Sequence, residues 1–296
     1  MTAAVRVRFP PVTLDNGGMK LSAPPELDDG ALVVGLPWDQ FLAYMQWAWK
    51  PGQHIAMIGP TGEGKTTFAA GLLGLRKWVM ALDPKGEDET LGASGFERVS
   101  HLPNQHLDLT WRLRHWETAR QWDRIHQRIA EGLPARVIVG GPSRTVEQDT
   151  ANQDLMRRSF LYAREAGGWT VYVDEFELIS SIRQFNLGGP VERMLISARR
   201  DGTSVITSFQ APVWVSKHAT RQARFAVVWP TGDRQMIKNV AESMGRDWKQ
   251  LAAAVDELPP FHVCVIPRGK NGGPFVCTSA PELGLSMPFM RRCGGF

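Results

Sequence analysis

The sequence predicts an α/β fold in which a mostly parallel central sheet is flanked by helices. Short apolar segments alternate with segments of helical periodicity along most of the chain, which is typical of a sheet covered on both faces. A glycine-rich segment lies between one predicted strand and the next helix, and two adjacent acidic residues follow a later strand. Both features lie at the tips of predicted strands.

Each element is expected from its residue types. Strands are predicted where short apolar runs are bounded by Gly, Pro or acidic residues, at 54–59, 78–83, 99–102, 137–140, 170–174, 204–209 and 225–229, with a terminal hairpin at 262–266 and 275–278. Helices are predicted where apolar side chains recur at helical spacing, at 65–75, 111–133, 154–166, 191–200 and 234–258.

One domain with two short appendages is expected. About 150 residues per domain allows one large domain or two small ones, but no Ser-, Gly- or Pro-rich stretch separates two halves of the 296 residues, and there is no internal repeat. We assign residues 1–36 to an irregular N-terminal arm, 37–258 to the core, and 259–296 to a C-terminal hairpin and tail.

The composition narrows the protein class. Hydrophobic residues make up 43% and charged residues 22%, which is ordinary for a protein with a core and excludes a disordered chain. No apolar run approaches the ~18 residues of a membrane span, and residues 1–11 lack the apolar core of a signal peptide. Three cysteines without a CxxC pair argue against a disulfide framework or a zinc site. We therefore expect a reduced, cytoplasmic protein.

The glycine-rich segment fits the pattern GxxxxGK[ST] in full. It comprises Gly59, Pro60, Thr61, Gly62, Glu63, Gly64, Lys65 and Thr66, and Thr67 follows. The glycines allow backbone N–H groups to turn around phosphate oxygens, and the following helix adds the positive end of its dipole. Lys65 is expected to reach the β- and γ-phosphates, and the Thr66 hydroxyl to ligate Mg²⁺. The segment predicts nucleoside triphosphate binding; the alternative is a chance glycine-rich turn.

Two acids lie at the tip of the strand 170–174. Asp174 is expected to hold Mg²⁺, and Glu175 to orient and deprotonate an attacking water. The alternative is that both are ordinary solvated acids at a strand end, without a catalytic role. The glycine-rich loop upstream favours the functional interpretation. An acid at position 175 also favours a hydrolase over a small-molecule kinase, which would need a pocket for a phosphoryl acceptor.

These motifs, together with the segment 199–212, resemble the FtsK/HerA superfamily of P-loop ATPases. The segment runs from two arginines through an apolar strand to Gln210, which is followed by a small residue and Pro. Segments 79–86 and 219–227 are similar to further parts of that family, so the resemblance covers about residues 52–280. In size, the chain resembles stand-alone viral or phage DNA-packaging ATPases rather than the large pumps, whose membrane and winged-helix domains it lacks.

The resemblance implies a RecA-like fold of the ASCE type, ATP and Mg²⁺ as cofactors, and Gln210 as the sensor of the γ-phosphate. It also implies a homo-oligomeric ring of five or six subunits that moves double-stranded DNA. A portal or capsid protein is a possible further partner, and no membrane association is expected. In such rings an arginine reaches the neighbouring active site. Arg199 and Arg200 are the first candidates, and Arg221 and Arg224 the competing pair; a surface ion pair is the alternative for each.

DNA contacts are less visible in the sequence. The net charge of +4 permits a polyanion partner without requiring one. Lys85 follows the second strand, and Arg183 lies in the glycine-containing segment 182–190. The arginines of 111–133 either follow a phosphate backbone or form a solvated face. No base-reading motif is present, as expected of a motor that ignores base sequence.

The sequence therefore predicts an ATP-driven double-stranded DNA translocase for viral genome packaging or DNA transfer, which would work in the host cytoplasm if the chain is viral. Two alternatives stay open. One is a P-loop ATPase switch that binds a protein partner, and the other is a small-molecule kinase. DNA-stimulated ATP hydrolysis distinguishes the first hypothesis from both.

Overall fold

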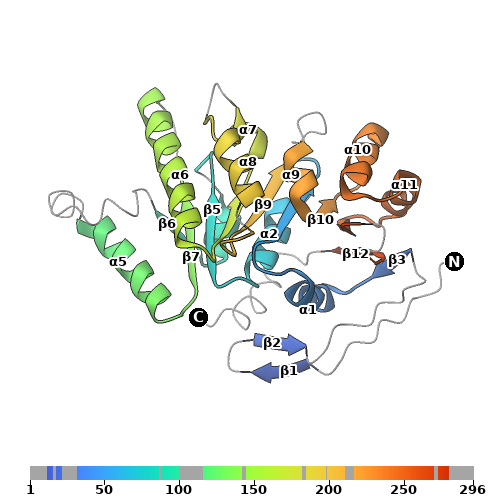
Figure 1. Cartoon of the computed structure of the whole chain (residues 1–296), viewed down its shortest axis with the longest axis horizontal. Helices are drawn as coiled ribbons and strands as arrows, with labels where there is room; N and C mark the ends of the chain where they lie inside the picture. The colour runs from blue at the N-terminus through green and yellow to red at the C-terminus, as the bar shows by residue number, and fades with distance from the viewer. Residues whose placement is uncertain are drawn as a thin grey trace.

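The structure is a computed structural model that describes residues 12–15, 18–21, 32–86, 88–99, 116–141, 145–181, 185–197, 199–210, 217–269 and 273–279. Within these residues, ten strands form one sheet with helices on both faces (Figure 1). No described helix is long and apolar enough to cross a membrane.

The main sheet is parallel over most of its width. In spatial order its strands are β3 (Val33–Gly35), β12 (Phe275–Ser279), β11 (His262–Pro267), β10 (Ala223–Val228), β4 (His54–Ile58), β9 (Ser204–Phe209), β8 (Thr170–Val173), β5 (Trp78–Leu82), β7 (Ala135–Val139) and β6 (Glu97–Val99). All neighbours from β10 to β6 are parallel, whereas β11 is antiparallel to β10 and to β12. Strands β1 (Val12–Asp15) and β2 (Gly18–Leu21) form a separate hairpin.

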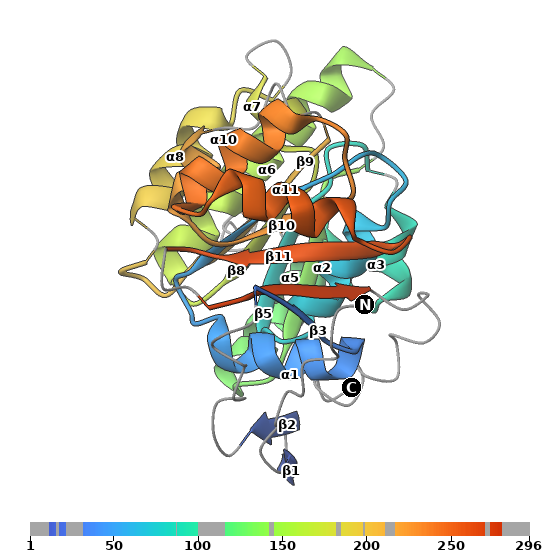
Figure 2. The ribbon, with the colours of Figure 1, turned by 90° about the vertical axis from the view of Figure 1, so that its right-hand side faces the viewer.

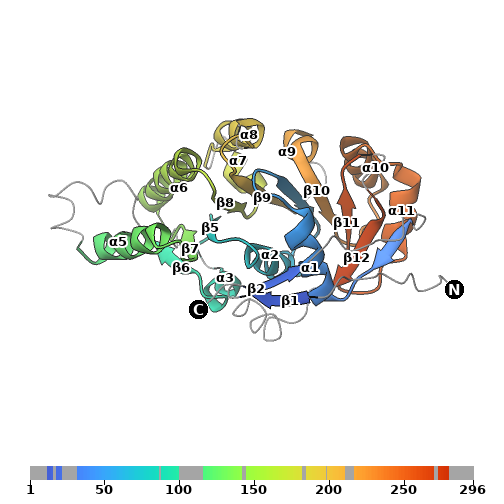
Figure 3. The same cartoon turned by 60° about the horizontal axis from the view of Figure 1, so that its bottom comes forward.

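Helices cover the sheet in two layers (Figure 3). One face carries α1 (Trp38–Ala48), α2 (Lys65–Leu73) and α3 (Glu89–Ala93). The other carries α5 (Trp116–Ala130), α6 (Val146–Ala166), α7 (Phe176–Ser180), α8 (Gly188–Ser197), α9 (Lys217–Gln222), α10 (Arg234–Met244) and α11 (Trp248–Asp256).

Each central strand is apolar on both sides because it separates two cores. In β4, Ile55 and Met57 pack toward α1 and α2, whereas Ala56 and Ile58 pack toward the opposite layer. This is the alternation expected of a strand buried on both faces. The continuous apolar run in the sequence is therefore explained by two covered faces.

The order of the strands brings distant segments together. Strand β9 lies between β4 and β8, with Phe209 opposite Ile58 and Thr207 opposite Val173. Because these strands are parallel, the segments that follow β4, β9, β8 and β5 all emerge at one edge of the sheet. We call this the loop edge, and the edge where these strands begin the opposite edge.

Most predicted elements are confirmed, with shifts at their ends. The predicted strand 99–102 lies at 97–99, and the helix predicted for 111–133 is described as α5 from residue 116. The helix predicted for 154–166 begins at 146, where the Thr145 hydroxyl caps it by accepting from the N–H of Gln148 at 3.3 Å. The helix predicted for 234–258 is two helices, because Gly245 ends α10 with a φ of 69° and Asp247 caps α11.

The arms are more ordered than expected. Strands β11 and β12 belong to the main sheet, and β3 pairs in parallel with β12 (Figure 2). The expectation of an irregular arm over 1–36 is therefore wrong for β3, whose three residues are too few for a periodic pattern. Helix α1 was also not predicted. It packs closely on α2, since a Cβ on Gly71 would lie 2.3 Å from the Trp38 ring.

We expect His54→Gln to flatten the pH dependence of stability. Burial lowers the pKa of His54 from 6.5 to about 4, and its Nδ1 accepts a hydrogen bond from the N–H of Val205 at 3.0 Å. As the pH falls below 6.5 the unfolded chain binds this proton first, so the folded state loses about 2 kcal/mol from this group between pH 7 and pH 5. Gln keeps an acceptor and does not titrate.

Urea unfolding at these two pH values measures the effect. The loss of unfolding free energy on acidification should be smaller for His54→Gln than for the parent chain. Equal losses would contradict the prediction.

Candidate functional site

The glycine-rich loop turns from β4 into α2 through two residues with positive φ. Gly62 has a φ of 85° and Gly64 a φ of 78°, a conformation that residues with a Cβ rarely adopt. Apart from the adjoining residues, no atom of the described part of the chain lies within 4 Å of a Cβ placed on either glycine. The backbone conformation, rather than lack of space, therefore requires glycine at both positions.

This loop rests on Trp229, which the sequence analysis did not identify as a functional residue. A Cβ on Gly59 would lie 2.7 Å from the Cβ of Trp229. The indole Nε1 donates to the carbonyl oxygen of Glu63 at 2.7 Å, and the buried ring packs edge-on against Phe68 of α2. One side chain just after β10 therefore supports both ends of the loop.

Lys65 is held inside its own loop. Its Nζ donates to the carbonyl oxygens of Gly59 at 2.8 Å and Pro60 at 2.5 Å, and the residue is 8% exposed. Burial lowers its pKa, while nearby carboxylates, Asp174 first among them, oppose this shift. The ammonium thus lies between the loop and the acids that follow β8.

Asp174 follows β8 directly and is largely enclosed. Burial raises its pKa to about 6, and the neighbouring carboxylates of Asp88, Glu175 and Asp83 add to the rise. The phenol of Tyr172 opposes it by donating to Asp174 Oδ1 at 2.8 Å. The aspartate is therefore positioned by a buried donor.

Glu175 has a constrained backbone at the start of α7. Its φ is 46°, which is uncommon for a residue with a side chain and is found mostly where the surrounding structure imposes it. Its carboxylate accepts from Lys85 Nζ at 2.5 Å and from Gln210 Nε2. The side chain is 14% exposed, so it is largely enclosed but still reached by solvent.

Gln210 connects the loop to the acids. Its Oε1 accepts from the Thr61 hydroxyl at 2.9 Å, and its backbone N–H donates to Glu177 Oε1 at 2.8 Å. A continuous path of hydrogen bonds therefore runs from Thr61 through Gln210 to Glu175 and on to Lys85. Glu177 was not predicted; its spacing two residues after Glu175 is the only sequence signal for it.

The turn after β5 presents Lys85 to this path. The two oxygens of Asp83 accept from the backbone N–H groups of Gly86 at 2.9 Å and Asp88 at 3.0 Å. Arg98 pairs with the same carboxylate at 2.9 Å. The Asp83 carboxylate thus holds the backbone of the turn in place, while the Lys85 side chain remains 60% exposed.

Two oxygen donors at this edge suit a hard cation. The Thr66 hydroxyl and the Asp174 carboxylate come from facing elements and match the preference of Mg²⁺ for oxygen ligands. Within the described residues, no group of three His, Cys, Asp or Glu side chains is arranged to hold a metal ion. The pair therefore fits a Mg²⁺ ion that is shared with substrate phosphates and water.

The candidate arginines lie at the opposite edge. Arg199 and Arg200 precede β9, whose six residues span about 20 Å. Both are exposed, and the structure records no hydrogen bond or ion pair for either guanidinium among the residues it describes. The backbone of Arg199 packs against Gly52, where a Cβ would lie 2.9 Å from the Arg199 carbonyl oxygen. Neither arginine can reach the loop of its own chain.

The competing arginines lie at the same opposite edge. Arg224, at the start of β10, donates to the carbonyl oxygen of Arg268 at 3.2 Å, whereas Arg221 is exposed at the end of α9. Two arginines of α5 have local partners: Arg124 pairs with Glu97, and Arg128 donates to a loop carbonyl. These contacts favour the solvated-face interpretation of α5.

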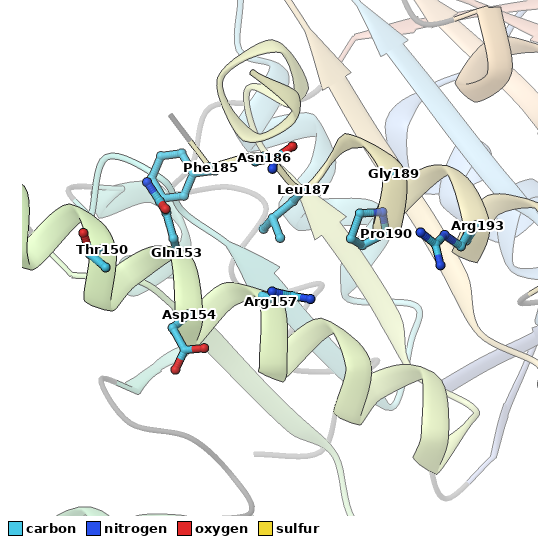
Figure 4. A pocket seen from close by; sticks show the side chains of 10 residues that line it. All are labelled: Thr150, Gln153, Asp154, Arg157, Phe185, Asn186, Leu187, Gly189, Pro190 and Arg193. Atoms are coloured by element: carbon cyan, nitrogen blue, oxygen red, sulfur yellow. The ribbon is translucent and has the colours of Figure 1, made fainter. Parts of the chain in front are cut away.

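Part of the predicted DNA segment 182–190 lines a separate cavity. Arg183 itself, and residues 211–216 after Gln210, lie outside the described part of the chain. The cavity holds about 480 Å³ between α6 and the start of α8 (Figure 4). Phe185 and Leu187 contribute apolar surface, and Arg157 and Arg193 contribute charge. No described residue of the phosphate loop lines it.

Solved structures with a similar fold include a viral genome packaging NTPase and VirB4. The genome packaging NTPase B204 from Sulfolobus turreted icosahedral virus 2, in complex with sulfate, is 14% identical with a TM-score of 0.53 over 78% of this chain and 98% of that one. The same protein with AMPPCP gives a TM-score of 0.50 at 14% identity, over 77% of this chain and 97% of that one. VirB4 of Thermoanaerobacter pseudethanolicus gives 0.50 at 11% identity, over 77% and 89%.

These likenesses show the fold. The α/β class with a mostly parallel sheet is confirmed, and it is the fold that the FtsK/HerA resemblance implies. Comparisons with protein-family models and with curated proteins found no match.

We expect Trp229→Phe to loosen the phosphate loop. Phenylalanine keeps a ring beneath Gly59 but cannot donate to the Glu63 carbonyl, and loss of such a hydrogen bond costs about 1 kcal/mol. Urea unfolding and equilibrium binding of ATP should both be weakened. Trp78→Phe is the matched control, because its indole donates to Leu133 far from the loop. Equal ATP binding by both variants would contradict a role for Trp229.

Proposed function

We propose that this chain is an ATPase that moves double-stranded DNA as a homo-oligomeric ring, in viral genome packaging or DNA transfer. The observation that carries the proposal is the hydrogen-bonded path from the phosphate loop through Gln210 to Glu175. Such a path suits a site in which the state of the nucleotide controls the catalytic base, Glu175. The B204 structures with a similar fold are named as genome packaging NTPases, one of them holding an ATP analogue, which supports the same class of activity here.

In the proposed reaction, the loop and Lys65 bind the triphosphate, together with Thr67 at the start of α2. Thr66 and Asp174 hold Mg²⁺, which neutralises phosphate charge and orients the triphosphate when bound. Glu175 accepts a proton from the attacking water. Gln210, bonded to both Thr61 and Glu175, reports whether the γ-phosphate is present.

DNA is proposed to act on this site through Lys85. Its ammonium pairs with Glu175, yet most of the side chain is exposed. A DNA phosphate that attracts Lys85 would remove one donor from the Glu175 carboxylate and make it a better proton acceptor. Arg183 stays a second proposed DNA contact. A portal or capsid protein would be a further partner, and the motor would work in the cytoplasm.

Arg199 and Arg200 are proposed to complete the site of a neighbouring subunit. They lie at the edge opposite to their own loop and have no recorded partner among the described residues, which suits side chains that act across an interface. Arg224 is a weaker candidate because it is bonded to Arg268. The exposed Arg221 remains the main competitor.

The test is ATP hydrolysis with and without duplex DNA. Hydrolysis should rise with DNA, and the effect should fall steeply with salt because phosphate contacts dominate such binding. Glu175→Gln should still bind ATP but lose about 10²–10⁴-fold in turnover, while Glu165→Gln on the exposed surface of α6 should behave as the parent. Hydrolysis that ignores DNA would instead favour the ATPase switch with a protein partner.

Mixing experiments test the arginines. Arg199→Ala with Arg200→Ala in one chain should bind ATP almost normally and lose about 10³-fold in turnover. Adding chains that carry Glu175→Gln but keep both arginines should restore activity, because each chain supplies what the other lacks. If both variants assemble and the mixture stays inactive, these arginines do not act across the interface, and Arg221 becomes the next candidate.

A further inference from the structure

A tyrosine hydroxyl is buried directly beneath the proposed Mg²⁺ site. Tyr172 lies in β8, two residues before Asp174, and is 0% exposed. Its ring belongs to the apolar core between the sheet and α2. Phenylalanine would fill the same space without burying a hydroxyl, so the polar atom calls for an explanation.

The phenol has polar partners on the segments around it. Its O–H donates to Asp174 Oδ1 at 2.8 Å. The hydroxyls of Thr66, from the first turn of α2, and of Ser208, from β9, both interact with the same phenol oxygen. A tyrosine phenol is protonated near neutral pH, so it has one proton to donate.

The direction of these hydrogen bonds follows from counting protons. A phenol has one proton, and Tyr172 gives it to Asp174. The phenol oxygen can then only accept, so Thr66 must be the donor in the contact between them. With its proton directed at Tyr172, the Thr66 oxygen keeps its lone pairs for other partners. Asp174 likewise retains its second oxygen for another ligand.

We propose that Tyr172 is a positioning residue for Mg²⁺, which fixes the Thr66 hydroxyl and the Asp174 carboxylate relative to each other with their free lone pairs toward the cation. This inference rests on the proposed function. Residues that orient metal ligands in this way change metal affinity about 10–100-fold when they are replaced. The role concerns the cation and not the triphosphate itself, which gives the proposal a specific test.

The test compares nucleotide binding with and without the metal. Tyr172→Phe keeps the ring and removes one oxygen. Its equilibrium affinity for ATPγS in EDTA should equal that of the parent chain. Adding Mg²⁺ should increase this affinity, and the Mg²⁺ concentration that gives half of the increase should be about tenfold higher than for the parent chain. Tyr162→Phe is the matched control, because it removes a phenol that bonds His126 away from the site, and its Mg²⁺ requirement should be unchanged.

A double variant separates positioning from general packing. If Tyr172 acts by fixing Thr66 and Asp174 relative to each other, Tyr172→Phe should add much less to the Mg²⁺ defect of Asp174→Asn than it adds to the parent chain, and full additivity would overturn the positioning role. Thermal unfolding checks that each variant folds; if Tyr172→Phe does not, Tyr172→Met offers a flexible apolar side chain of similar size, and the same Mg²⁺ shift is expected of it.

The possible outcomes distinguish the positioning role of Tyr172 from the proposed ATPase function. An unchanged Mg²⁺ requirement in the folded variant overturns the positioning role and leaves the proposed ATPase intact. Equal weakening in EDTA and in Mg²⁺ also overturns it, because that result indicates a general packing defect. Failure of the parent chain to bind ATPγS with Mg²⁺ overturns both this inference and the proposed function.

Discussion

Strand β9 pairs with β4 on one side and with β8 on the other, and the arrangement of the site follows from this pairing. The residue after β9 must emerge between the loop that follows β4 and the acids that follow β8. A glutamine fits there because its amide offers an acceptor to Thr61 and a donor to Glu175 at the same time. A shift of β9 by one residue would turn its side chains to the other face and break both contacts.

The same edge gathers charges of both signs at short range. Carboxylates follow β8 and β5, and each has a donor: Lys85 for Glu175, the Tyr172 phenol for Asp174, and Arg98 with two backbone amides for Asp83. Buried charges persist only where such partners exist. These carboxylates therefore have partners within one chain, whereas Arg199 and Arg200 at the opposite edge are exposed to solvent. This asymmetry distinguishes the two edges of the sheet.

Local patterns in the sequence predict much of this structure. The glycine-rich loop is recognised from its own eight residues, and Asp174 and Glu175 from the apolar strand directly before them. Contacts that depend on strand order were missed. Trp229 donates to the Glu63 carbonyl although the two residues are 166 positions apart in the chain. Nothing in the local sequence around Trp229 indicates that contact. The first turns of α6 were missed because their side chains are mostly exposed and lack an apolar stripe. The break between α10 and α11 needed the left-handed Gly245, which apolar periodicity alone does not indicate.

The hydrogen bonds of Lys65 to the carbonyls of Gly59 and Pro60 have a consequence for how this site can be studied. These hydrogen bonds connect the two ends of a short, glycine-rich turn. Without them the turn gains conformational freedom, so the lysine acts as an internal tie. Incoming phosphate oxygens would exchange one set of partners for another on a turn that is already formed. Replacing Lys65 by alanine would remove both the contact to the ligand and the tie, so weaker binding in that variant mixes lost attraction with the entropy of reordering the turn.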